Sequence, residues 1–376
     1  MDKTLQESSD FQVDWLTSRL SQWVWNSPGR AVRLGHRESR WFADDLQACP
    51  VQKPVFIAGL ARSGTTILLE FMATLEGVAT HRYRDFPLVH IPVWWNKFLD
   101  LTPRKSMDPV ERSHRDGIRI TPESPEAMEE PIWMSFFPLA HDSAASQVLD
   151  AATVNPAFEA FFRDHLRKIL FVRKGRRYVS KGNYNVTRLE YLLRVFPDAR
   201  FVVPVREPAG HVASLMKQHR IFTENLRGNS RALEHLRRVG HFEFGPDRRV
   251  VNAGNTALAR EVEALWAVGE EARGWARYWA SIHGFLAARM ESDPLFRKAV
   301  RLVQFEELCE RPATELRKIA EHGEFDEAAQ GAERFAERIR FPRYYAPSFS
   351  KADGMSIRDE TANVFERLMS FQNKEY

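Results

Sequence analysis

One short segment of the sequence carries the residue types that bind anions. It comprises Arg62, Ser63, Gly64, Thr65 and Thr66. The apolar run 56–58 before it is typical of a buried strand, and residues 67–72 resume with helical spacing. A turn between a strand and a helix start presents unpaired backbone N–H groups and the positive end of the helix dipole. The segment therefore predicts a phosphate or sulfate site, and the alternative is a tight turn in which Ser63 serves only as N-cap.

This segment differs from the loop of nucleotide-hydrolysing enzymes. The pattern G-x-x-x-x-G-K-[ST] needs Lys after its second Gly, whereas Thr65 follows Gly64 and the cation is Arg62. An apolar strand ending in Asp would hold Mg²⁺ in such enzymes, but the run 201–206 ends in Arg206. A kinase or nucleotidase of the P-loop type stays an alternative that magnesium-dependent ATP turnover would support.

A second anion-binding candidate follows a βαβ pattern. Residues 177–181 and 199–206 are expected strands, and residues 188–196 between them form an amphipathic helix, which implies that the two strands run parallel. Arg206 ends the second strand, and Ser214 lies in the next helix. Because ligands bind at the carboxyl ends of strands in open α/β sheets, we expect Arg206 and the first loop to face one crevice. A solvated salt bridge at the helix start is the alternative.

Together, residues 54–66, residues 196–208 and Ser214 resemble the cofactor-binding segments of the sulfotransferases that use 3′-phosphoadenosine 5′-phosphosulfate (PAPS). Residues 303–312 are similar to the later strand-to-helix element of that family. The resemblance is to the Golgi, tyrosylprotein-like and bacterial branch rather than to the cytosolic branch. It implies an α/β, P-loop-like fold in three layers, with a central, mostly parallel sheet flanked by helices.

The resemblance also implies the ligand and its contacts. PAPS is the expected donor co-substrate, with no metal. The residues expected at its 5′ end are Arg62, Ser63, Gly64, Thr65 and Thr66. Arg206 and Ser214 are expected on its 3′-phosphate. Transfer of a sulfuryl group to a hydroxyl acceptor by in-line displacement follows as the expected reaction.

Two cations are candidates for stabilising the charge that builds up during transfer. Lys181, in Ser180-Lys181-Gly182-Asn183, stands where the tyrosylprotein branch has Asn-Lys-Asp-Pro, whose Lys stabilises the departing phosphate. This chain lacks the Asp-Pro, and a solvated Lys at a strand end is the alternative. Arg62 is the second catalytic cation that we expect.

The acceptor hydroxyl needs a base, and the sequence leaves several open. Asp85 stands in the segment where the branch with a carboxylate base has Glu; an ion pair with Arg82 or Arg84 is its alternative. Rival carboxylates lie in residues 122–131, and Glu129 and Glu130 are our candidates among them; an acidic helix start is the alternative. The rivals are Glu123, Glu126, Glu129 and Glu130, and the histidines considered are His81, His90, His114 and His141.

Composition sets the wider limits. The chain has 376 residues, 44% of them hydrophobic, and a net charge of +4. We expect one domain over 1–376, with a helical N-terminal wrap at 1–50, an acceptor-side helical insertion at 88–170 and a charged insertion at 223–262 that holds a possible hairpin at 242–251. A long helix is expected near 258–291. Cys49 and Cys309 are too few for a disulfide framework or a zinc site.

The same features narrow the partners. The charges are too mixed for a nucleic-acid-binding protein. The polar start of the chain and the lack of an apolar run of roughly 18 residues indicate a cytoplasmic protein with no transmembrane segment. The acceptor class that we expect is a carbohydrate or a lipid or glycan precursor. A catalytically silent nucleotide-binding scaffold is the remaining alternative, because fold alone does not imply function.

Overall fold

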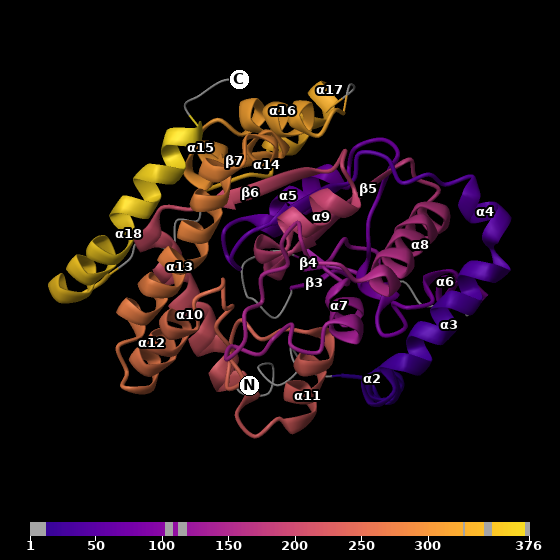
Figure 1. The fold of residues 1–376 in the computed structure, drawn as a ribbon, viewed down its shortest axis with the longest axis horizontal. Helices are drawn as coiled ribbons and strands as arrows, with labels where there is room; N and C mark the ends of the chain where they lie inside the picture. Colours follow the sequence, from indigo (N-terminus) through magenta and orange to yellow (C-terminus); the bar gives the residue numbers. More distant parts are fainter. Residues whose placement is uncertain (1–12, 102–107, 112–118, 326–327, 342–347, 373–376) are drawn as a thin grey trace.

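A parallel five-stranded sheet forms the centre of the computed structural model (Figure 1), which describes residues 13–101, 108–111, 119–325, 328–341 and 348–372. The strand order is β2-β5-β1-β6-β7. The strands are β1 (Val55–Ala58), β2 (Val78–Ala79), β5 (Arg177–Gly182), β6 (Arg200–Val205) and β7 (Val300–Gln304). Parallel register pairs Ile57 with Lys181 on one side of β1 and with Val202 on the other. The expected α/β architecture with a central parallel sheet is confirmed.

Strand β1 shows why the sheet is covered on both faces. Its residues are all buried, as expected for the central strand of a parallel sheet. Side chains alternate between the faces of a strand, so Phe56 and Ala58 belong to one hydrophobic cluster and Val55 and Ile57 to another. Each face therefore needs its own layer of helices.

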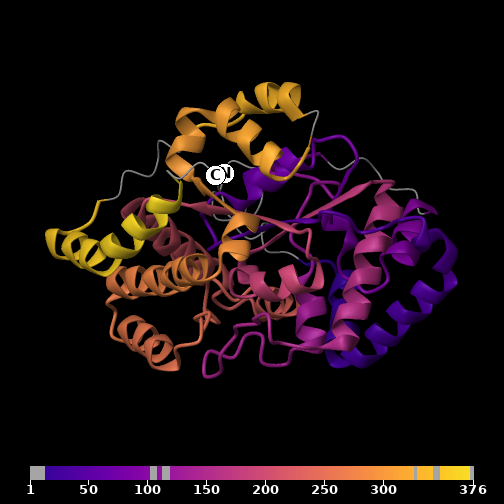
Figure 2. The same cartoon turned by 45° about the horizontal axis from the view of Figure 1, so that its top comes forward.

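The two helical layers come from different parts of the chain (Figures 1 and 2). The layer beside Phe56 contains α8 (Pro156–Arg173), α9 (Leu189–Val195), α10 (Pro208–Leu226), α13 (Glu271–Ser292) and α14 (Pro294–Ala299). The layer beside Val55 contains α5 (Thr65–Met72), α15 (Phe305–Glu310), α16 (Pro312–His322) and α17 (Ala328–Ala336). The C-terminal helix α18 (Lys351–Gln372) packs along α13.

The remaining elements lie at the two ends of the sheet. In Figure 1 the N-terminal helices occupy the end opposite α12, α13 and α18. They are α2 (Trp15–Asn26), α3 (Pro28–Trp41) and α4 (Ala43–Gln47). Residues 88–170 contribute α6 (Pro92–Leu101), β3 (Val110–Glu111), β4 (Arg119–Ile120), α7 (Glu130–Phe136) and α8. Two short 3₁₀ helices are η1 (Tyr83–Asp85) and η2 (Asn183–Thr187). No helix in the described ranges is both long and apolar enough to cross a membrane.

Two sequence-based expectations in the later chain are wrong. Residues 223–262 form the end of α10, α11 (Ser230–Val239) and the start of α12 (Thr256–Ala267), and the expected hairpin at 242–251 is a turn without strands. Its backbone closes through Arg249 N–H donating to the Phe242 carbonyl at 2.9 Å. The long helix expected near 258–291 is two helices, α12 and α13, because Gly269 takes a left-handed conformation (φ 83°) that ends the first.

Candidate active site

The loop between β1 and α5 has the backbone of an anion-binding turn. Gly64, with φ 109°, is the N-cap of α5, so the first N–H groups of the helix have no side-chain cap to satisfy them. A Cβ atom at Gly64 would lie 2.9 Å from the Phe305 ring, which leaves room only for glycine. The Ser63 side chain is fully buried, and its Oγ has no hydrogen-bond partner among the described residues. These features fit an anionic group seated on the loop.

Helix α10 holds this loop in place through a neutral histidine. His211 Nε2 lies 2.9 Å from the Ala61 carbonyl, and Trp279 Nε1–H donates to His211 Nδ1 at 3.1 Å. Nδ1 therefore accepts and Nε2–H donates. Burial lowers the pKa of His211 well below its usual value, which keeps the ring neutral. Ser214, on the same helix, accepts a hydrogen bond from Arg62 Nε at 3.4 Å.

Arg206 reaches the same loop from the end of β6. Its side chain is buried, and its guanidinium carbon lies 5.1 Å from the centroid of the Phe305 ring. The same ring covers Gly64. Phe305 follows β7 directly, so the segments after β1, β6 and β7 meet at one edge of the sheet. This arrangement brings Arg206 and the loop together, as the sequence predicts.

Lys181 lies on the other side of the loop. Its Nζ donates to Thr66 Oγ1 at 3.1 Å and forms an ion pair with Glu126 Oε1 at 2.6 Å. Glu126 also accepts from the Tyr83 hydroxyl, on Oε2, at 2.6 Å. The Lys181 and Glu126 side chains are only 8% and 13% exposed, so both are largely shielded from solvent. At the end of β5, Lys181 therefore contacts both a carboxylate and a loop hydroxyl.

Asn183 connects the loop to a second carboxylate that sequence reasoning missed. Thr65 Oγ1 donates to Asn183 Oδ1 at 3.4 Å, and Asn183 Nδ2 donates to Glu243 Oε1 at 2.9 Å. Glu243 Oε2 lies 3.4 Å from His241 Nδ1. Glu243 is 60 residues from Asn183 in a segment without regular structure, so no local pattern in the sequence pointed to it.

A sequence model described as "Sulfotransferase family" matches residues 54–243, just over half of the chain. The chain belongs to the sulfotransferase family. The matched span of this sulfotransferase contains the loop, Lys181, Arg206, Ser214 and Glu243, and Phe305 lies outside it.

Solved bacterial sulfotransferases are similar to the chain over most of its length. STF1 from Mycobacterium tuberculosis H37Rv is 16% identical with a TM-score of 0.46, covering 88% of this chain and 81% of its own. STF9 from Mycobacterium avium is 15% identical with a TM-score of 0.47, covering 88% and 80%. The sulfotransferase from Alicyclobacillus acidocaldarius is 14% identical with a TM-score of 0.37, covering 87% and 98%. In sequence, no curated protein matches the chain significantly.

Asp85 of the sulfotransferase lies in a closed network of polar contacts outside the anion loop. Its side chain is fully buried. Oδ1 accepts from Arg173 and from Asn96 Nδ2 at 2.9 Å, and Oδ2 lies 3.1 Å from His81 Nδ1. Burial alone would raise the pKa of Asp85, but the His81 hydrogen bond and the Arg173 charge hold it well below its usual value. The partner is Arg173, not the expected Arg82 or Arg84 side chain, and the saturated oxygens argue against Asp85 as the base.

Glu129 and Glu130 also have structural partners. The Tyr178 hydroxyl donates to Glu129 Oε1 at 2.5 Å, and the Glu129 side chain is buried. Arg188 donates to both oxygens of Glu130, at 2.8 and 2.9 Å. Although burial opposes ionisation, the charges of Arg188 and His141 lower the pKa of Glu130 to about 2. A carboxylate stabilised this strongly is a weak base, so these contacts argue against Glu130 as the proton acceptor. Glu129 contacts Tyr178 of β5 and not a residue of the anion loop.

The candidate histidines that the structure describes are His81, His90 and His141. All three are buried. Burial lowers the pKa of His90 to about 3. His141 pairs with Glu130 at 2.7 Å. His114 lies outside the described residues.

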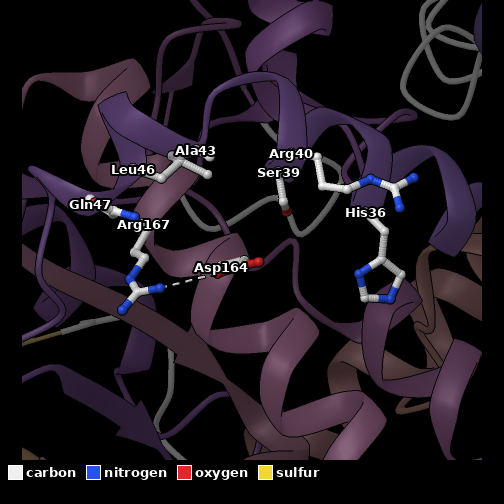
Figure 3. Close-up of a pocket in the computed structure, with 8 residues that line it drawn as sticks. All are labelled: His36, Ser39, Arg40, Ala43, Leu46, Gln47, Asp164 and Arg167. Atoms are coloured by element: carbon white, nitrogen blue, oxygen red, sulfur yellow. Dashed lines mark hydrogen bonds and ion pairs between the residues drawn. The ribbon is translucent and has the colours of Figure 1, made fainter.

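A separate groove of about 360 Å³ lies on the outer side of α3, α4 and α8. Figure 3 shows Arg167 turned toward Asp164, with which it pairs at 3.2 Å, while His36 and Arg40 lie at the far side. Its lining includes none of the predicted site residues. The groove is therefore separate from the anion loop and its neighbours Lys181 and Arg206.

Proposed function

We propose that this sulfotransferase uses PAPS as its sulfuryl donor and transfers the sulfuryl group to a hydroxyl. The observation that carries the proposal is the convergence on one loop of Lys181 from β5 and Arg206 from β6. A donor with anionic groups at two positions needs two separated cations, and these come from strands on opposite sides of β1. The lysine of a magnesium-dependent P-loop is replaced by Thr65.

The roles that we propose for the chain's residues are those that the resemblance to the PAPS-dependent sulfotransferases implies. The loop N–H groups and the hydroxyls of Ser63, Thr65 and Thr66 bind the phosphosulfate end. Arg206 and Ser214 bind the 3′-phosphate. Lys181, held by Glu126 and already in contact with Thr66, stabilises the negative charge that develops on the departing phosphate oxygen. Arg62, fixed by its hydrogen bond to Ser214, adds a second cation at this edge.

The donor assignment is tested by binding of the desulfated product, 3′,5′-diphosphoadenosine. Calorimetry should show that the wild type binds it and that Arg206→Ala binds at least about 10-fold more weakly, because hydrogen bonds to charged groups contribute roughly 1.5–3 kcal/mol. Arg297→Ala, which removes an arginine of α14, is the control and should bind like the wild type. Unchanged binding by Arg206→Ala would refute the assignment.

The acceptor belongs to the same proposal. We propose a carbohydrate or a lipid or glycan precursor with a free hydroxyl, bound on the side formed by Tyr83, Glu126 and the 88–170 insertion. The base is a carboxylate, as in the tyrosylprotein-like branch. Incubating the purified protein with ³⁵S-labelled PAPS and a cell extract, followed by fractionation into lipid, glycan and protein, identifies the class. Label confined to protein would exclude this acceptor assignment.

A further inference from the structure

Two glutamates of similar exposure are linked to the loop hydroxyls, one through Lys181 and one through Asn183. The side chains of Glu126 and Glu243 are 13% and 14% exposed. Glu126 Oε1 accepts from Lys181 at 2.6 Å and from the Ala127 N–H at 2.7 Å, and Oε2 accepts from the Tyr83 hydroxyl. Hydrogen bonds to the ionised form of a carboxylate lower its affinity for a proton. We therefore expect Glu126 to position Lys181 and not to act as a proton acceptor.

Glu243 has no lysine or arginine partner among the described residues. Its Oε1 accepts a hydrogen bond from Asn183 at 2.9 Å, and the Tyr184 side chain also hydrogen-bonds to the carboxylate. Its ion pair in that part of the chain is with His241, at 3.4 Å, and not with a lysine or arginine. Glu243 therefore lacks the lysine partner that Glu126 has, and a carboxylate without such a partner is the better proton acceptor.

A single amide group separates Glu243 from the loop. Asn183 Oδ1 accepts from Thr65 Oγ1, and the Nδ2 of the same amide donates to Glu243. This pattern fixes which end of the amide faces the loop. Asn183 follows Lys181 by two residues, so one strand end presents both the cation and the link to the carboxylate.

The groups around Glu243 come from three elements. Tyr184 of η2 accepts a hydrogen bond from the Phe242 N–H at 2.9 Å, and burial followed by the charge of Glu243 raises the pKa of Tyr184 well above its usual value. Burial, together with the charge of Glu243, also raises the pKa of Tyr278 of α13. The ring of His241 stacks on Phe222 of α10 at 5.1 Å. The two phenols stay protonated and neutral, so neither of them adds a charge beside Glu243.

We infer that Glu243, positioned by Asn183 and His241, is the base that accepts the proton of the acceptor hydroxyl. The inference rests on the proposed function. In the step, the acceptor oxygen forms a bond to sulfur, and the bond between sulfur and the oxygen of the 5′-phosphate breaks. The electron pair of that bond leaves with the phosphate, where Lys181 stabilises it, and the proton of the hydroxyl moves to the Glu243 carboxylate.

The test compares Glu243→Gln with Glu126→Gln in the full chain. Two reactions are followed between pH 5 and 8: release of 3′,5′-diphosphoadenosine from PAPS with water as acceptor, and ³⁵S transfer to a cell extract. Glu243→Gln should lower both rates by about 100-fold or more and abolish the fall in rate on the acidic side, because general bases contribute about 10²–10⁴-fold. Its affinity for 3′,5′-diphosphoadenosine should stay within about threefold of the wild type. Glu126→Gln should retain the acidic fall, and the exposed control Glu224→Gln should match the wild type.

The outcomes separate this inference from the donor assignment. If the wild type fails to bind 3′,5′-diphosphoadenosine, the donor assignment fails. If the wild type binds it and Glu243→Gln keeps its rate and its acidic fall, the inference is overturned. Loss of the acidic fall in Glu126→Gln alone would overturn it in favour of Glu126. If Glu243→Gln does not fold, Glu243→Asp decides: the shorter side chain keeps the charge but moves the carboxylate, so both rates should fall at least about 10-fold while the affinity for 3′,5′-diphosphoadenosine stays within about threefold. Unchanged rates would overturn the inference.

Discussion

Lys181 and Arg173 are both basic, both nearly buried and both paired with a carboxylate, yet they differ in what else they touch. The side chains of Lys181 and Arg173 are 8% and 6% exposed. Lys181 donates to Glu126 and also to Thr66, a hydroxyl of the anion loop. Arg173 donates to Asp85, to Asn96 and to the Thr80 carbonyl.

The difference distinguishes a charge that stabilises the fold from one that is held for a ligand. The Arg173 network closes on itself, because Asp85 in turn accepts from Asn96 and from the Arg82 N–H. The Lys181 chain ends on a hydroxyl group beside a helix N-terminus, where an anion binds most favourably. Burial alone does not distinguish Lys181 from Arg173, because both are nearly buried. The groups that each cation contacts do distinguish them.

The largest expected effect tests the closed network. Asp85→Ala leaves Arg173 buried without its anion and should lower the free energy of unfolding by about 3–5 kcal/mol in urea titrations. Asp100→Ala removes one of the two carboxylates that pair with Arg84; because the Asp100 side chain is 65% exposed, the change should cost at most about 1 kcal/mol. An Asp85→Ala protein of wild-type stability that had lost transfer activity would restore Asp85 as the base.

The next prediction concerns the rate of sulfuryl transfer and changes Lys181, which contacts the anion loop. Lys181→Met should lower sulfuryl transfer about 10²–10³-fold, because one preorganised charge at the developing anion contributes that much. Lys97→Met, an exposed position on α6, is the control. If Lys181→Met lowered stability but not the transfer rate of the folded protein, Lys181 would belong with Arg173.

The closed networks should also make the protein sensitive to acid. The pKa of Glu130 is lowered in the folded protein from 4.5 to about 2. The stabilisation is therefore complete above pH 4.5 and is lost as the pH falls toward 2, with Glu130 contributing about 3 kcal/mol of it. Denaturation at pH 5 and pH 3 should show a smaller drop for Glu130→Gln than for the wild type. Glu291→Gln, which breaks an exposed pair with Arg367, should leave the drop nearly unchanged.

The smallest expected effect concerns Ser214. Ser214→Ala removes the acceptor of the Arg62 Nε–H bond and one proposed phosphate contact. Affinity for 3′,5′-diphosphoadenosine should fall about 3- to 10-fold in calorimetry, because a single net hydrogen bond contributes about 0.5–1.5 kcal/mol. Ser370→Ala, on the exposed part of α18, should have no effect. An equal loss in both variants would place Ser214 outside the site.

The strands and the loop could be predicted because their signals are local. In residues 54–66 and in residues 199–206, an apolar strand pattern is followed within a few positions by a charged residue. The state of a carboxylate depends instead on distant partners: Arg173 is 88 residues from Asp85, and Arg188 is 58 residues from Glu130. The same distance in sequence hid Glu243, whose hydrogen bond to Asn183 exists only once the segment after α11 has packed on η2.

Arg62 occupies a left-handed backbone conformation, with φ 71°, that residues with a side chain rarely adopt. Such strain costs on the order of 1 kcal/mol and persists where function requires it. Selection of variants for heat resistance alone should therefore favour Gly or Asn at this position, while selection for transfer should keep the guanidinium. Evolution under the two pressures would pull residue 62 in opposite directions, so a thermostabilised version of this enzyme needs its gains from elsewhere in the chain.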